Sequence, residues 1–97
     1  MPTFEPMSAF ARDYDKLTSA QQAAFNRAVG VFRDDLAKGD GFRPGLRVKK
    51  MAGHDGVWEM TWASDGRATF HYGDVIREGH QHVVWRRIGT HEIFANP

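Results

Sequence analysis

The chain changes its hydrophobic period once, at the glycine-rich stretch Lys38-Gly39-Asp40-Gly41-Phe42-Arg43-Pro44-Gly45. Before this stretch apolar residues recur at helical spacing, and after it they alternate with polar residues as in half-buried strands. Glycine and proline interrupt both kinds of element, so the break separates a helical part from a sheet part. Each part has an apolar face that only the other can cover. We therefore predict one domain, residues 1–97, of the α+β class.

Two helices are predicted before the break, joined as a hairpin that covers one face of the sheet. The first follows a short strand at residues 3–5, begins with Ser8 as N-cap and carries one apolar stripe. The second begins at residues with capping-box spacing and ends at Gly39, which supplies a left-handed cap. The residues that define these starts and stripes are Phe10, Tyr14 and Leu17, then Thr18 with Gln21 and Ser19 with Gln22.

Four strand-like segments follow the break, at residues 46–51, 57–62, 67–72 and 82–88. Turn residues between them, above all Asp65-Gly66, indicate a small, mainly antiparallel sheet of four to five strands. Alternation sends the apolar residues of each strand toward the helices. Arg86 fits poorly, because this register points it toward the helices as well. The opposite face is expected to carry Arg47, Lys49, Glu59, Arg67, His71, Trp85, Arg87 and His91.

Composition limits the classes of function. No apolar stretch approaches the roughly 20 residues of a membrane span, and the chain has no cysteine, so a cytoplasmic protein with no membrane partner is expected. His80 and His82 have strand-type spacing for zinc, but no third ligand is evident. We therefore expect neither a metal nor a cofactor. All five histidines follow the break, as do most of the cations.

A sheet face of this kind suits a ribose-phosphate ligand. Cations hold phosphates, an exposed tryptophan stacks on a base, and imidazole or carboxylate groups transfer protons. Four cations without an acid lie between Phe42 and Lys50, where they raise the local potential for phosphate. A solvated edge strand protected by lysines explains each of these cations equally well.

The ending Arg87-x-Gly89-Thr90-His91, followed by Phe94, resembles that of the RelE/ParE superfamily of bacterial toxins. It is most similar to the branch that includes the HigB and YafQ ribonucleases. Upstream, the segments 46–53, 57–60 and 65–72 are similar to the three preceding strands of that family, in order. With the helical N-terminal half, the resemblance covers nearly the whole chain and implies the RelE-like fold.

The resemblance also implies a function. Such a protein is the toxin of a type II toxin-antitoxin system and binds a cognate antitoxin, with which it can form a hetero-oligomer. Its expected activity is a metal-independent endoribonuclease that cleaves mRNA, usually in the ribosomal A site, through attack of the 2′-hydroxyl on the adjacent phosphate. The alternatives are a ParE-like inhibitor of DNA gyrase and a noncatalytic RNA-binding relative.

Candidate site residues follow from the resemblance and from the polar sheet face together. His91 is the candidate acid, or else the base; Arg67 and Arg87 are the candidate phosphate contacts; Glu59 is either a general base or a partner of Arg67. The alternatives are a capping role for His91 and surface salt bridges for the two arginines. The expected RNA- or phosphate-binding residues are Arg47, Lys49, Lys50, His71, Trp85 and Phe94. Strand parity favours Lys49 over Lys50.

Overall fold

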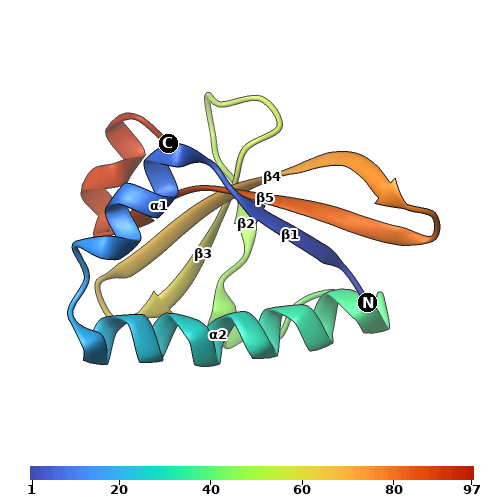
Figure 1. Cartoon of the computed structure of the whole chain (residues 1–97), viewed down its shortest axis with the longest axis horizontal. Coiled ribbons are helices and arrows are strands. Elements are labelled where there is room, and N and C mark those ends of the chain that lie inside the picture. The colour runs from blue at the N-terminus through green and yellow to red at the C-terminus, as the bar shows by residue number, and fades with distance from the viewer.

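The computed structural model describes residues 1–97 and contains two α-helices and a five-stranded sheet (Figure 1). The strand order is β1-β5-β4-β3-β2, with β1 parallel to β5 and the other pairs antiparallel. The α+β class and the mainly antiparallel sheet are thus confirmed. The elements in chain order are β1 (Thr3–Pro6), α1 (Ser8–Asp15), α2 (Ser19–Lys38), the 3₁₀ helix η1 (Pro44–Leu46), β2 (Lys49–Lys50), β3 (Trp58–Ala63), β4 (Gly66–Arg77), β5 (His80–Gly89) and the 3₁₀ helix η2 (His91–Ala95).

Helix α2 begins and ends as its sequence predicts. The Thr18 hydroxyl accepts from the backbone N–H of Gln21, the Gln21 side chain accepts from the backbone N–H of Thr18, and Gly39 closes the helix at φ 76°. Of the two predicted capping boxes, therefore, the structure uses the one that begins at Thr18. Helix α1 starts one residue earlier than predicted, because Met7 takes the N-cap position and Ser8 is already helical. Neither helix is long and apolar enough to cross a membrane.

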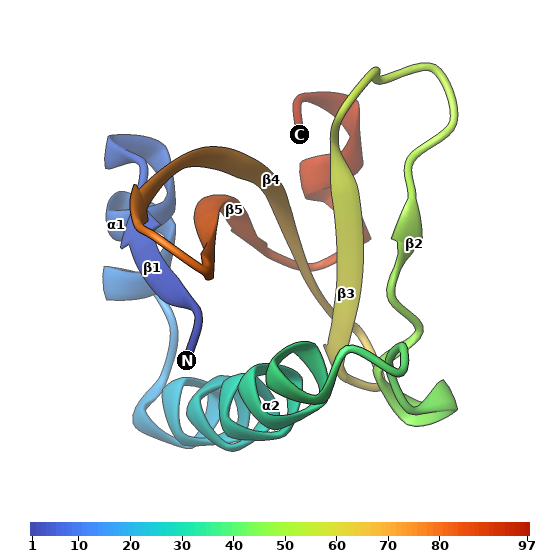
Figure 2. The same ribbon diagram turned by 90° about the vertical axis from the view of Figure 1, so that its right-hand side faces the viewer.

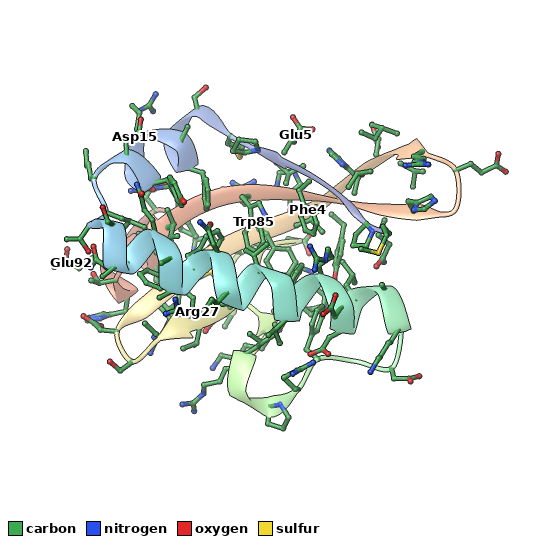
Figure 3. The ribbon with its side chains drawn as sticks, turned by 60° about the horizontal axis from the view of Figure 1, so that its bottom comes forward. Phe4, Glu5, Asp15, Arg27, Trp85 and Glu92 are labelled. Atoms are coloured by element: carbon green, nitrogen blue, oxygen red, sulfur yellow. The ribbon has the colours of Figure 1, made fainter.

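Helix α2 lies across one face of the sheet (Figure 2), and the core fills the space between the two (Figure 3). Trp85 of β5 is its centre: the side chain is 5% exposed, and its ring centroid lies 5.4 Å from those of Phe25 and Phe32 and 5.3 Å from that of Phe70. The prediction that Trp85 lies on the outer face is therefore wrong, and Trp85 cannot stack on a base. Burying these rings is the main source of stability here.

A β-bulge in β5 explains this error. Phe70 pairs with Trp85 but Thr69 pairs with Arg87, so Arg86 is an extra residue without a partner on β4. The extra residue shifts the alternation by one position, as bulges do. Trp85 therefore faces the core, whereas Val84, which a regular strand would place on the helix side together with Ile88, lies on the outer face, paired with His71. The shift also frees Arg86 from the helix side, where the regular register had placed it.

Strand β2 is shorter than predicted, and the β4–β5 hairpin is longer. Pro44 starts a 3₁₀ turn, and Arg47 follows it in the left-handed region at φ 49°, so the ladder cannot begin before Lys49. Beyond their pairing with neighbouring strands, β4 and β5 continue as a projecting hairpin, visible on the right of Figure 1.

Candidate functional site

The outer face of the sheet carries a polar row that crosses four strands. Paired positions run from Lys49 to Glu59, then to Thr69 and to Arg87. The Lys49 Nζ lies 3.8 Å from the Glu59 Oε1, and the Glu59 side chain is 14% exposed. Glu59 therefore pairs with Lys49 rather than with Arg67. The Thr69 hydroxyl is buried and has no hydrogen-bond partner in the structure.

Arg87 is held by an ion pair with helix α1. Its Nε lies 2.6 Å from Asp13 Oδ2, its Nη2 3.2 Å from Asp13 Oδ1, and its Nη1 donates to the Asn96 carbonyl at 3.1 Å. The hydrogen bonds to Asp13 raise the pKa of Arg87 above its ordinary value, against the effect of burial. Arg87 thus lies in the expected row, and its guanidinium already has protein partners.

The expected proton-transfer residue lies at the end of the sheet where β5 stops. His91 is the first residue of η2, and its Nδ1 lies 3.4 Å from Asp65 Oδ1 in the turn between β3 and β4. Both side chains are exposed, at 71% and 69%. The helix cap is Thr90, whose hydroxyl accepts from the Glu92 N–H, so His91 does not perform the capping role considered for it.

Arg67 lies at the same end of the sheet. It pairs with Gly89 of β5, two residues before His91. Its Nη1 donates to backbone carbonyls of the β3–β4 turn, at 3.0 Å to Gly66 and 3.3 Å to Ala63. Such carbonyl bonds fix the guanidinium in place without neutralising its charge.

Three hollows surround this end of the sheet. The largest, about 740 Å³, lies between η1, α2 and the β3–β4 turn and is lined by Arg47 and Arg67. A second, about 230 Å³, shares Ser64 with the first and reaches Thr90. A third, about 430 Å³, reaches from Thr90 to Arg87. An open surface with charged arginines at intervals can follow a polyanionic strand.

A second polar cluster lies on the outer face toward β1. His71 Nδ1 lies 3.0 Å from Arg86 Nη1, and burial, then the Arg86 charge, lower the pKa of His71. The buried His82 lies 2.7 Å from the Thr3 hydroxyl through Nδ1 and 2.6 Å from the Glu5 carboxylate through Nε2. The sequence does not indicate the contacts of His82 with Thr3 and Glu5, because only the parallel pairing of β1 with β5 brings these residues together.

The two histidines of the His-x-His pair, His80 and His82, contact different residues. His80 contacts the N-terminal amine of Met1 at 2.7 Å, whereas His82 turns to Thr3 and Glu5. The structure holds no group of three or more His, Cys, Asp or Glu side chains that could bind a metal ion.

The remaining residues expected to contact RNA lie at separate places on the fold. Lys50 pairs with Trp58, and its Nζ lies 5.5 Å from the centroid of the Trp58 ring, away from the row that Lys49 joins. This agrees with the parity that favours Lys49. Arg47 is exposed at the largest hollow, and Phe94 is half-buried in η2.

The fold is that of several toxins of solved structure, so the RelE-like fold expected from the sequence is confirmed. The structure is similar to that of a copper-bound mutant toxin from Helicobacter pylori, with 18% sequence identity, coverage of 95% of this chain and 97% of that one, and a TM-score of 0.70. It is similar to the Escherichia coli DinJ-YafQ toxin-antitoxin complex, with 11% identity, coverage of 94% and 93%, and a TM-score of 0.69.

The same arrangement extends to the RelB-RelE antitoxin-toxin complex of Methanococcus jannaschii, with 11% identity, coverage of 97% of this chain and 95% of that chain, and a TM-score of 0.59. No protein-family model and no curated protein matches this sequence. At such low identities the likeness defines the fold, while the chemistry depends on the residues of the site.

Proposed function

We propose that this protein is the toxin of a toxin-antitoxin system and a metal-independent endoribonuclease that cleaves mRNA on the ribosome, in the cytoplasm. The observation that carries the proposal is that four charged or titratable side chains lie toward one end of the sheet, beside open hollows. These are His91, the Asp65 carboxylate that it contacts, Arg67 and Arg87. The RelE-like fold supports the toxin role, because its structural neighbours are toxins.

The proposed reaction needs a base, an acid and cations. The RNA 2′-oxygen attacks the adjacent phosphorus while its proton passes to the base, for which Glu59 is the candidate. The bond between phosphorus and the 5′-oxygen then breaks, and His91 gives its proton to that oxygen. The products are a 2′,3′-cyclic phosphate and a 5′-hydroxyl end. Arg67 and Arg87 stabilise the charge that develops on the phosphate oxygens.

Other residues hold the RNA in this proposal. Arg47 contacts phosphates in the largest hollow, which Arg67 also lines. Lys49 adds positive charge beside Glu59, and Lys50 and Phe94 contact the RNA nucleotides that flank the cleaved bond. Asp65 is a positioning residue, since its carboxylate lies 3.4 Å from His91 Nδ1 and orients the ring. We propose an antitoxin as the protein partner, because three of the structural neighbours are toxin-antitoxin complexes.

The test is a cell-free translation reaction with a defined mRNA, in which new RNA ends are mapped by primer extension. Wild-type protein should cleave within codons and only with ribosomes present, and treating the purified protein with EDTA and then removing the EDTA before the reaction should leave the cleavage unchanged. His91→Ala should reduce cleavage by about 100-fold or more, the usual contribution of a positioned acid or base. Arg27→Ala, at an exposed arginine of α2 (Figure 3), is the matched control and should cleave normally.

A second candidate function is a binding toxin without nucleolytic chemistry, such as a gyrase inhibitor or an RNA-binding regulator. The engagement of Arg87 favours it, because all three guanidinium nitrogens already have protein partners. Intact mRNA at high toxin concentration would exclude the ribonuclease. Inhibition of gyrase supercoiling would then identify the first form of this candidate, and retention of RNA without cleavage the second.

A further inference from the structure

His71 has surroundings unlike those of His91. It lies on the outer face in the middle of β4, opposite Val84, and is half-buried. The one hydrogen bond of its side chain joins Nδ1 to Arg86 Nη1, at 3.0 Å. The charged and titratable groups that face it are Arg86 and His82 from β5 and Glu5 from β1.

The partner fixes the tautomer of this ring. A guanidinium can only donate hydrogen bonds and does not lose its proton in proteins, so His71 Nδ1 must accept with its lone pair. In the neutral ring the single proton is then on Nε2. Protonating Nδ1 as well would turn one N–H group toward another and place two cations in contact.

Arg86 is itself fixed, so this arrangement does not depend on a mobile side chain. Its Nε donates to the Pro97 carbonyl at 3.1 Å while its Nη1 reaches His71. The bulge in β5 directs Arg86 to this face, because a regular strand would point it toward the helices. Burial and the Arg86 charge lower the pKa of His71, and the opposing attraction of Glu5 is a smaller effect. The ring is therefore neutral at pH 7.

We propose that His71 is a fixed, neutral hydrogen-bond donor that presents Nε2–H to a phosphate oxygen of bound RNA, and is not the general base of the cleavage. This inference rests on the proposed function, because it takes RNA as the ligand. A neutral donor adds specificity without adding charge. It therefore releases no counterions when it binds, unlike the charged Arg67 near the start of the same strand.

The tautomer can be measured without any activity, by nitrogen-15 NMR of the histidine rings in the wild-type protein. His71 should show a protonated Nε2 and a bare Nδ1 at pH 7, and Nδ1 should take up a proton only below the ordinary pKa of histidine. A proton on Nδ1 at pH 7, or uptake of that proton at or above the ordinary pKa of histidine, would overturn the inference whatever the protein does to RNA.

The role of Nε2–H is tested by binding of a short single-stranded RNA with 2′-O-methyl groups, which cannot be cleaved. His71→Gln places an amide N–H near the position of Nε2, whereas His71→Asn places it near Nδ1 and His71→Ala removes it. We expect the Asn and Ala variants to bind about tenfold more weakly and the Gln variant to lose less than about threefold. The slope of log K against log salt should stay unchanged in all three, but decrease by about 0.7 in Arg67→Ala.

Failure of the inference and failure of the proposed function give different results. If His71 were the base, His71→Gln would cleave as poorly as His71→Ala while both bound RNA normally, since an amide cannot take a proton. If the protein were no RNA-binding toxin, wild type and every variant would fail to bind. That result would reject RNA as the ligand even with the expected tautomer.

Discussion

Asp35 shows how a single residue can close a loop and respond to pH. Its carboxylate is buried near the C-terminal end of α2, where the helix dipole disfavours a negative charge. Arg43, beyond the glycine-rich loop, offsets this with hydrogen bonds from its backbone N at 3.0 Å, its Nε at 2.9 Å and its Nη2 at 2.8 Å. These bonds lower the pKa of Asp35 to about 2.

A pH dependence of stability follows at this residue. In the unfolded chain the carboxyl has a pKa of about 3.9, so the folded state binds its proton less tightly. The stabilisation is fully present above about pH 4 and is lost as the pH falls toward about 2. Asp35→Asn lacks this group, so the stability difference from wild type in urea unfolding should shrink over that window. A constant difference from pH 5 to pH 2 would contradict the assignment.

The environment of Trp85 also depends on a single residue, because the extra residue Arg86 in β5 places Trp85 in the core and not on the outer face. At the centre of the aromatic core, replacing it by alanine leaves a large cavity and should cost about 3–5 kcal/mol in the free energy of unfolding. Trp58→Ala, at a half-buried position of β3, should cost less. A cost for Trp85→Ala within about 0.5 kcal/mol would instead indicate an exposed side chain.

At the scale of elements, features with a local cause could be predicted from the sequence. The capping box of α2, the Gly39 cap and the Asp65-Gly66 hairpin each depend on residues a few positions apart, and all three are present. The bulge at Arg86 has no such local signal. The only indication of the bulge in the sequence is that a regular strand points Arg86 at the core, where a charged side chain fits poorly. The Thr3, Glu5 and His82 contacts depend on a parallel pairing between distant segments, so they could not be found either.

The capping box gives the prediction for this scale. Thr18→Ala removes the hydroxyl that accepts from the Gln21 N–H, leaving an unpaired donor at the first turn of α2. The loss should be about 1 kcal/mol in urea unfolding. Ser19→Ala is the matched control, since Ser19 is exposed and makes no side-chain hydrogen bond, so it should change stability little. Equal losses in the two variants would show that the second predicted box, with Ser19 as cap, forms in solution.

For the whole molecule, the ion pair between Asp13 and Arg87 joins the two ends of the chain. Asp13 comes from α1, and its Oδ2 also accepts from the backbone N–H of Ile88, beyond the point where β1 stops covering β5. Arg87 continues the connection to the carbonyl of Asn96. A single carboxylate thus holds the first helix against the strand that carries the candidate site, and its loss should affect both.

Asp13→Ala removes an acceptor of three hydrogen bonds and leaves Arg87 without its counter-ion. A fully buried pair loses about 3–5 kcal/mol in this way, but the Arg87 side chain is 26% exposed, so water compensates in part and we expect about 2–3 kcal/mol. Asp15→Ala, two residues along the same helix at an exposed position (Figure 3), is the control and should change stability by less than about 0.5 kcal/mol. Hydrogen exchange should also quicken at the Ile88 amide in Asp13→Ala alone, because that N–H loses its acceptor. Equal stability of the two variants, with the Ile88 amide still protected, would mean that the sheet and not the ion pair holds β5 in place.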